Sequence, residues 1–172
     1  MSPPPHPAMI AGQEDDDVRL TVRTNLAMRV LMYCAVRRDG LVRSGDMARA
    51  CNASTHHVAQ VVNRLSALGV LHTLRGRAGG VRLARDPADI TVGEVFARFE
   101  ADLPLTECFD HANNTCPLTK GCRLRAALIR AVGAFYGALD EVTLDELVCG
   151  NADLEAIFSD HRCAPAQRAA LA

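Results

Sequence analysis

The segment STHHVAQVVNRLSALGVLHTLRGRAGGVRL, residues 54–83, decides the fold, because two hydrophobic periods follow one another in it. Its first half places apolar residues at helical spacing behind Ser54, a good N-cap, which predicts a helix to about Leu68. Residues 70–74 and 81–83 then alternate in strand fashion around an Arg- and Gly-rich tip. This second half predicts a hairpin of two short strands.

Two further helices are predicted before this segment. Residues 25–37 carry apolar side chains at helical spacing, and a short helix capped by Ser44 follows, ending at Cys51. The turn Asn52-Ala53 joins it to the next helix. Two helices joined by a tight turn, the second with a polar face, and then a hairpin are typical of a winged helix-turn-helix.

Charge is divided unevenly along the 172 residues, although the formal net charge is only −1. Residues 18–85 have a net charge of +10, residues 86–172 a net charge of −7, and residues 1–17 a net charge of −4. A basic half joined to an acidic half indicates a polyanion-binding module attached to a control element. Together with the winged-helix pattern, this predicts binding to double-stranded DNA.

The predicted DNA contacts lie on the second helix of the motif and at the hairpin tip. Side chains at the N-terminal end of a recognition helix reach base edges, and Arg in a wing follows the phosphate backbone or enters the minor groove. Gln60 is suited to bidentate binding of adenine. The residues predicted to contact DNA are Ser54, Thr55, His56, His57, Gln60, Asn63, Arg64, Arg75 and Arg77.

Three cysteines share the loop-like stretch ECFDHANNTCPLTKGC, which begins at Glu107. Seven residues separate Cys108 from Cys116, and five separate Cys116 from Cys122. Thiolates gathered this closely select zinc or iron–sulfur clusters. Pro, Gly and Asn break any helical or strand period here, so we expect a bound group to hold the loop. Three thiolates are one fewer than the usual four ligands, and a further ligand is therefore expected.

The composition excludes several classes of protein. No stretch approaches 18 apolar residues, and residues 1–17 are Pro-rich and acidic without an apolar core, so we expect a cytoplasmic protein without a membrane partner. Seven cysteines in that reducing compartment indicate metal or redox chemistry rather than disulfides. Cys34 and Cys51 lie on apolar helical faces and are expected in the core.

The acidic half predicts three more helices. Thr91 and Glu94 form a capping-box pattern for a helix to about Ala101. A long helix over residues 123–139 carries a narrow apolar seam, as in helices that pair with a partner, which predicts a homodimer. Thr143 caps a short helix that ends near residue 148. The seam consists of Leu124, Leu128, Ala131, Val132, Phe135 and Leu139.

The sequence thus predicts a mainly α protein with a small β-hairpin wing: a winged helix-turn-helix plus a long C-terminal dimerisation helix. The expected division is a disordered N-terminal extension over residues 1–17, a DNA-binding domain over 18–100, a cluster-binding loop over 101–122, a dimerisation helix with a short following helix over 123–148, and a flexible tail over 149–172.

Three segments together resemble a known family. They are VRLTVRTNLAMRVLMYCA (residues 18–35), HHVAQVVNRLSALGVLHTLRGRAGGVRLARDP (56–87) and ECFDHANNTCPLTKGCRL (107–124). The chain is similar in them to the Rrf-type family of dimeric bacterial iron–sulfur winged-helix regulators, over about residues 18–148. The third segment most resembles the loop of the nitric-oxide-sensing, NsrR-type repressors in that family.

The resemblance implies a homodimeric repressor rather than an enzyme. It implies that Cys108, Cys116 and Cys122 bind an iron–sulfur cluster, [4Fe–4S] in NsrR-type proteins, with [2Fe–2S] as the alternative. It also implies that the cluster-loaded form represses genes for nitric-oxide detoxification and that nitrosylation of the cluster releases the DNA.

One position departs from the family pattern. In some relatives an Asp from the partner's first helix completes the cluster, and the matching residue here is Asn25. A neutral amide is a poorer iron ligand, and it can coordinate through oxygen, hydrogen-bond the cluster, or leave the position to water or a thiol. Arg29, one turn on, can interact with Asn25 or with the surroundings of the cluster. Glu107, Asp110 and His111 are the other candidate ligands.

Three alternatives remain open from the sequence. The first is a zinc-stabilised DNA-binding module that senses nothing. The second is a regulator of the same fold that responds to iron or cluster status. The third, a redox enzyme with a Cys nucleophile, is disfavoured because no triad or cofactor fingerprint accompanies the cysteines.

Overall fold

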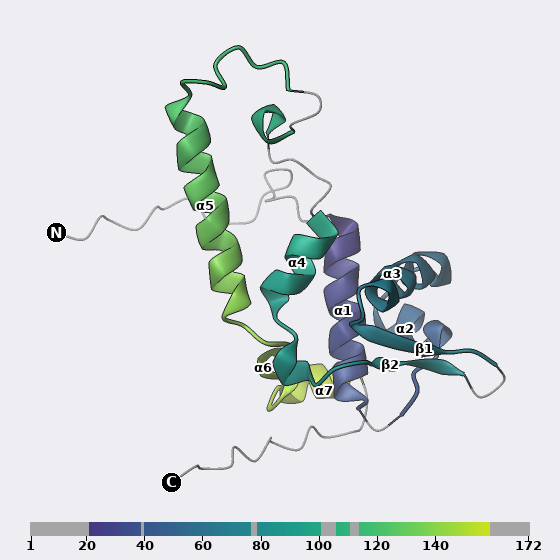
Figure 1. The fold of residues 1–172 in the computed structure, drawn as a ribbon. Helices are drawn as coiled ribbons and strands as arrows, with labels where there is room; N and C mark the ends of the chain where they lie inside the picture. The colour runs from purple at the N-terminus through teal and green to yellow at the C-terminus, as the bar shows by residue number, and fades with distance from the viewer. Residues whose placement is uncertain (1–20, 39, 77–78, 101–105, 111–113, 159–172) are drawn as a thin grey trace, which may run out of the picture.

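The predicted architecture is confirmed in its main lines. The computed structural model describes residues 21–38, 40–76, 79–100, 106–110 and 114–158. Helices surround a central helix, a two-stranded antiparallel hairpin projects from one side, and one long helix lies apart on the other (Figure 1). The predicted extension over residues 1–17 lies outside the described residues.

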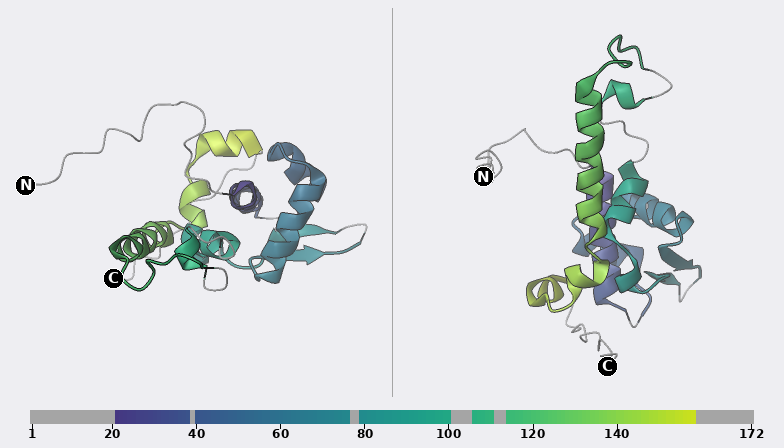
Figure 2. Two further views of the ribbon diagram at one scale, coloured as in Figure 1. Left: turned by 90° about the horizontal axis from the view of Figure 1, so that it is seen from above. Right: turned by 60° about the vertical axis from the view of Figure 1, so that its left-hand side comes forward.

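Helix α1 (Val22–Val36) is the centre of the core. Thr21 is its N-cap, and its hydroxyl oxygen accepts a hydrogen bond from the Thr24 N–H at 3.2 Å. Ten of the fifteen residues are buried, so the helix is enclosed on nearly all sides rather than along one stripe. Figure 2 shows α1 end-on in its left view, with other helices around it. The sequence predicted this helix but placed its start three residues late.

The helix-turn-helix forms as expected. Helix α2 (Ser44–Ala50) and helix α3 (Thr55–Ala67) are joined by a turn in which Asn52 has a φ of 47°. Ser44, predicted as a cap, is instead the first helical residue of α2. The apolar stripe of α3 is buried against α1 and α2, as its spacing predicted. Its members are Val58, Val61, Val62 and Leu65.

The hairpin consists of β1 (Leu71–Leu74) and β2 (Gly80–Leu83), paired antiparallel. A bridge between Val42 and Val81 ties β2 to the segment that precedes α2. A Cβ atom on Gly80 would meet the Leu41 Cβ at 2.8 Å, so the two segments pass this closely only because residue 80 is glycine.

The acidic half returns to the core. After the short 3-10 helix η1 (Pro87–Asp89), helix α4 (Val92–Glu100) packs on α1, and so do α6 (Leu144–Val148) and α7 (Ala152–Phe158). Helix α7 lies within residues 149–172, which the sequence predicts as a flexible tail, and it packs on α1 as α6 does. Both helices pack on α1, which is distant in sequence, so the local spacing of apolar residues does not predict these contacts.

Helix α5 (Arg123–Asp140) is the exception, since it contacts mainly α4 and has no buried residue. Its C-terminal end approaches the start of α4 closely, and a Cβ on Gly93 would overlap the Asp140 carboxylate. From there α5 runs away from the body, as the right view of Figure 2 shows. Among the described residues, no helix is long and apolar enough to cross a membrane.

Helix α7 is expected to stabilise the body through its last residue. The Phe158 ring is buried and meets the Tyr33 ring edge-on at 5.3 Å, and the Phe158 carbonyl accepts from Arg37 Nη2 at 3.0 Å. Replacing Phe158 with Ala should lower the free energy of unfolding by about 3 kcal/mol, measured by urea denaturation. The neighbouring Ile157 is 71% exposed, so Ile157→Ala is the matched control and should change it by less than about 0.5 kcal/mol. Equal effects would contradict the packing of α7.

Candidate DNA-binding face and cysteine loop

The polar face of α3 is open to solvent. Its buried stripe points into the core, and the side chains predicted to read DNA lie on the opposite side. Ser54 also closes the helix, because its hydroxyl accepts from the His57 N–H at 3.2 Å. His56 Nε2 and Gln60 Nε2 lie 3.0 Å apart, which holds the Gln60 amide on this face. The exposed set is Ser54, Thr55, His56, His57, Gln60 and Asn63.

Arg64 does not belong to this exposed set. It is half-buried, its Nη2 donates to the Arg98 carbonyl at 2.6 Å, and its guanidinium carbon lies 5.2 Å from the centre of the Phe99 ring. The sequence assigned Arg64 to DNA because its position on α3 is polar. The sequence around Arg64 does not reveal that the C-terminal end of α4 lies beside this side chain.

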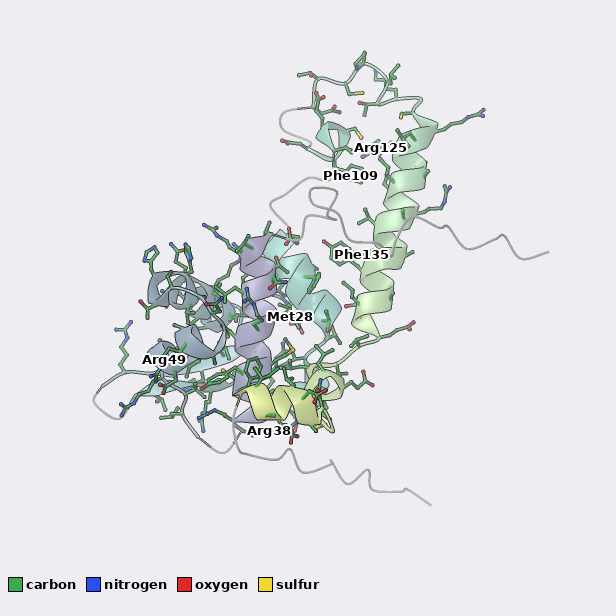
Figure 3. The ribbon with its side chains drawn as sticks, turned by 180° about the vertical axis from the view of Figure 1, so that it is seen from behind. Met28, Arg38, Arg49, Phe109, Arg125 and Phe135 are labelled. Carbon is green, nitrogen blue, oxygen red and sulfur yellow. The ribbon has the colours of Figure 1, made fainter. Side chains whose placement is uncertain are left out.

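The wing and the turn supply further positive charge. Arg75 is exposed at the end of β1, and Arg77 lies outside the described residues. Arg49, which no sequence motif singled out, lies on α2 with its side chain 82% exposed and paired with Asp46 (Figure 3). It borders a cleft of about 480 Å³ between α2 and the start of α3. The sequence feature that could have indicated Arg49 is its place as a basic residue in the last turn of α2, just before the turn that leads to α3.

The cysteine loop is tied together by hydrogen bonds rather than by a core. In the short 3-10 helix η2 (Glu107–Phe109), the Glu107 carboxylate accepts from both the hydroxyl and the N–H of Thr115. These bonds, the hydroxyl one first, hold the pKa of Glu107 below its usual value. Glu107 precedes Cys108, and Thr115 precedes Cys116. This contact therefore brings the segments that carry the first two cysteines together.

Arg125 joins the two ends of the loop. Cys122 is the N-cap of α5, and its sulfur accepts from the Arg125 N–H at 3.4 Å. The Arg125 Nε donates to the Cys108 carbonyl at 3.2 Å, and its guanidinium lies over the Phe109 ring at 5.7 Å. Figure 3 shows Arg125 on α5 directed toward Phe109 of η2. One residue therefore contacts the surroundings of the first and the last cysteine.

The three thiols are close in the chain but do not form a closed metal site. Cys108, Cys116 and Cys122 are all half-buried. No three His, Cys, Asp or Glu side chains of the described residues lie near enough to hold one metal ion. No described residue of 106–122 is buried, and Leu118 is 67% exposed, so packing does not hold this segment. Such a donor set on a coreless loop fits a soft metal or an iron–sulfur group.

Asn25 lies in the first turns of α1, and this end of α1 lies beside the C-terminal end of α4 (Figure 1). Its side chain is exposed, so a second chain can reach it. Arg29 differs from the expectation, because its Nη1 donates to the Cys51 carbonyl at 2.7 Å, at the end of α2. Among the other candidate ligands, Asp110 is half-buried beside η2, and His111 lies outside the described residues.

Cys34 and Cys51 are core residues, as predicted. Each is 2% exposed, and the Cys34 sulfur lies 3.9 Å from the Met47 sulfur. Burial, and secondarily Cys51, raises the pKa of the Cys34 thiol to about 12. Burial also raises the pKa of Cys51. The chain therefore has dry, protonated thiols in its core and accessible thiols on its loop.

Comparison with known sequences gives relatives over most of the chain. The Rrf2 family model, described as an iron-dependent transcriptional regulator, matches residues 20–150. The chain is 40% identical over 146 residues to the HTH-type transcriptional regulator NsrR of Geobacillus kaustophilus, a match that covers 84% of this chain and 99% of that one. It is 39% identical over 133 residues to the HTH-type transcriptional repressor NsrR of Streptomyces coelicolor, covering 76% and 88%.

Solved structures agree on the fold. IscR of T. potens superposes with a TM-score of 0.61 at 20% identity, covering 76% of this chain and 85% of that one. CymR of B. subtilis, a global cysteine regulator, superposes with a TM-score of 0.60 at 23% identity, covering 77% and 97%.

The two kinds of thiol should be separable by alkylation of the metal-free chain. At pH 8, a pKa of about 12 leaves about one Cys34 thiol in 10,000 ionised, and only the thiolate reacts. Iodoacetamide should therefore modify Cys108, Cys116 and Cys122 well before Cys34 and Cys51, as measured site by site by mass spectrometry. The urea-unfolded chain is the control, in which all five should react at similar rates. Early modification of Cys34 in the folded chain would refute this assignment.

Proposed function

This chain belongs to the Rrf2 family of transcriptional regulators and is a DNA-binding repressor, and from that premise we propose that it senses nitric oxide through an iron–sulfur cluster. Cys108, Cys116 and Cys122 hold the cluster, which is [4Fe–4S] in this proposal and [2Fe–2S] in its alternative. The observation that supports it is a loop without buried residues that carries three half-buried thiols, in which Thr115 binds the Glu107 side chain and Arg125 contacts both the Cys108 carbonyl and the Cys122 sulfur. A chromosomal repressor of this kind acts in the cytoplasm.

The protein's own residues prepare the loop for such a group. When bound, the cluster supplies iron that nitric oxide attacks. Cys122 presents its sulfur at the N-terminus of α5, where backbone N–H groups and the helix dipole favour negative charge. Arg125 adds a positive charge beside Cys108, which balances the charge of gathered thiolates. Loss of the cluster frees this loop, and the DNA is released.

DNA binding is assigned to the face of α3 and to the basic residues around it. The exposed side chains from Ser54 to Asn63 enter the major groove, and Arg75 and Arg77 of the wing follow the phosphate backbone. Arg49, beside the cleft at the start of α3, contacts a phosphate. Arg64 is left out of this set because α4 holds it.

The dimer is assigned to α5. This helix has no buried residue, and its exposed apolar side chains include Leu124 at 65%, Ile129 at 44% and Phe135 at 41%. A helix with this much unburied apolar surface is stabilised by a partner. A second copy of the chain also gives two recognition helices for two half-sites of operator DNA.

A second candidate is a regulator of the same fold that responds to iron availability. The family model's description as iron-dependent favours it. The DNA face, the dimer and the cysteine loop keep the same roles in this candidate, and only the signal differs.

Anaerobic purification followed by titration tests both candidates. We expect a brown protein with visible absorption that changes on addition of nitric oxide while operator DNA is released in parallel. Cys116→Ser should abolish the colour, whereas Cys34→Ala, in the core, should retain it. Release by an iron chelator but not by nitric oxide would favour the iron-responsive candidate. A colourless protein that holds only zinc would refute both.

Asn25 is proposed as the contact that one chain makes with the cluster of its partner. If its amide oxygen ligates, Asn25→Asp should slow cluster loss under a chelator, because a carboxylate is the better iron ligand, and Asn25→Ala should accelerate it, each by about tenfold. The decay of visible absorption measures both rates. Identical cluster stability and nitric-oxide sensitivity in the two variants would exclude ligation by this residue.

A further inference from the structure

Arg64 caps the C-terminal end of α4 from the recognition helix. The carbonyl of Arg98, to which Arg64 Nη2 donates at 2.6 Å, lies in the last turn of α4, where helix carbonyls lack partners within the helix. A positive charge is favoured at this end of a helix. The guanidinium also stacks on Phe99, whose side chain is only 7% exposed. Two different contacts thus hold α3 against one turn of α4.

Glu100, the last residue of that turn, joins it to α1. Its Oε1 accepts from the Thr21 N–H at 3.1 Å, from the Thr21 hydroxyl at 2.9 Å, and from the Thr24 hydroxyl. Thr24 is fully buried, so its hydroxyl requires this local network. The end of α4 is therefore a junction, defined here as Arg64, Phe99, Glu100, Thr21 and Thr24, between the recognition helix and the first turn of α1.

The junction is also close to the cysteine loop along the chain. Only residues 101–107 separate Glu100 from Cys108 in the chain. Resting on the proposed function, we infer that Arg64 is a positioning residue that transmits the state of the cysteine loop to the recognition helix. With the loop held, the last turn of α4 stays formed and Arg64 fixes α3 in its DNA-binding orientation. With the loop released, that turn loosens and α3 loses its contact with α4.

The chemistry of Arg explains the choice of residue. A planar guanidinium donates to a carbonyl and stacks on an aromatic ring at the same time, whereas a Lys ammonium donates without stacking. Arg64→Lys should therefore keep part of the coupling, and Arg64→Ala should remove it. The control is Arg98→Ala, because Arg98 lies in the same turn and its 51% exposed side chain pairs only at 3.8 Å with Glu94. This change removes the same charge but leaves the carbonyl that Arg64 binds.

The test compares operator DNA binding of each variant before and after nitric-oxide treatment, with the absorption spectrum recorded in parallel. The ratio of the two dissociation constants measures the coupling, which lies at roughly 5- to 150-fold in typical regulated proteins. We expect the Arg98→Ala variant to keep the ratio of the unmodified chain. Arg64→Ala should reduce it to about twofold or less with an unchanged spectrum, and Arg64→Lys should lie between. In the cluster-loaded chain, Arg64→Ala should also accelerate amide hydrogen exchange in α3 and in the last turn of α4.

Several results would overturn the inference. If Arg64 contacts DNA directly, Arg64→Ala weakens binding of both forms alike and the ratio is unchanged. Unchanged hydrogen exchange at the end of α4 in the Arg64→Ala variant would also refute the coupling. If Arg64→Ala does not fold, Arg64→Lys decides, and an unaltered ratio in that variant refutes the coupling. A chain that shows no response to nitric oxide even without substitution refutes the proposed function, which is a distinct outcome.

Discussion

The enclosure of α1 is the constraint on which the rest of the structure depends. Ten of its fifteen side chains are buried, and α3, α4, α6 and β2 all pack on it. A helix buried on nearly all sides cannot rotate without displacing every neighbour. The orientation of the recognition helix relative to α4 is therefore fixed by a shared support, so that a contact such as that of Arg64 has a defined partner.

Local features of the sequence explain how much of this could be predicted. The apolar stripe of α3, the Ser54 cap and the Arg/Gly tip of the hairpin are short-range signals, and the structure confirms the elements they predict. Helix α7 could not be foreseen, because it is stabilised by Phe158 against Tyr33, 125 positions earlier in the chain. The contacts of Arg64 and Arg29 could not be predicted for the same reason: their partners, the carbonyls of Arg98 and Cys51, are distant in sequence.

The candidate site divides in the same way. Spacing and composition were enough to single out Cys108, Cys116 and Cys122 and to place Cys34 and Cys51 in the core. The hydrogen bonds that organise the loop, from Thr115 to Glu107 and from Arg125 to Cys108, depend on the path of the chain between them. No sequence period or motif encodes that path, so the roles of Thr115 and Arg125 in the loop are apparent only from the folded structure.

The close approach of Gly93 to Asp140 gives α5 the character of a lever with a fixed base. Eighteen residues at 1.5 Å each make an arm of about 27 Å between that base and Cys122. A tilt of about 10° at the base would displace the far end by about 5 Å, the scale of one helical turn. A small change of angle at the body therefore corresponds to a large displacement of the Cys122 thiol. In the opposite direction, a force on the cysteine loop acts on α4 through the full length of α5.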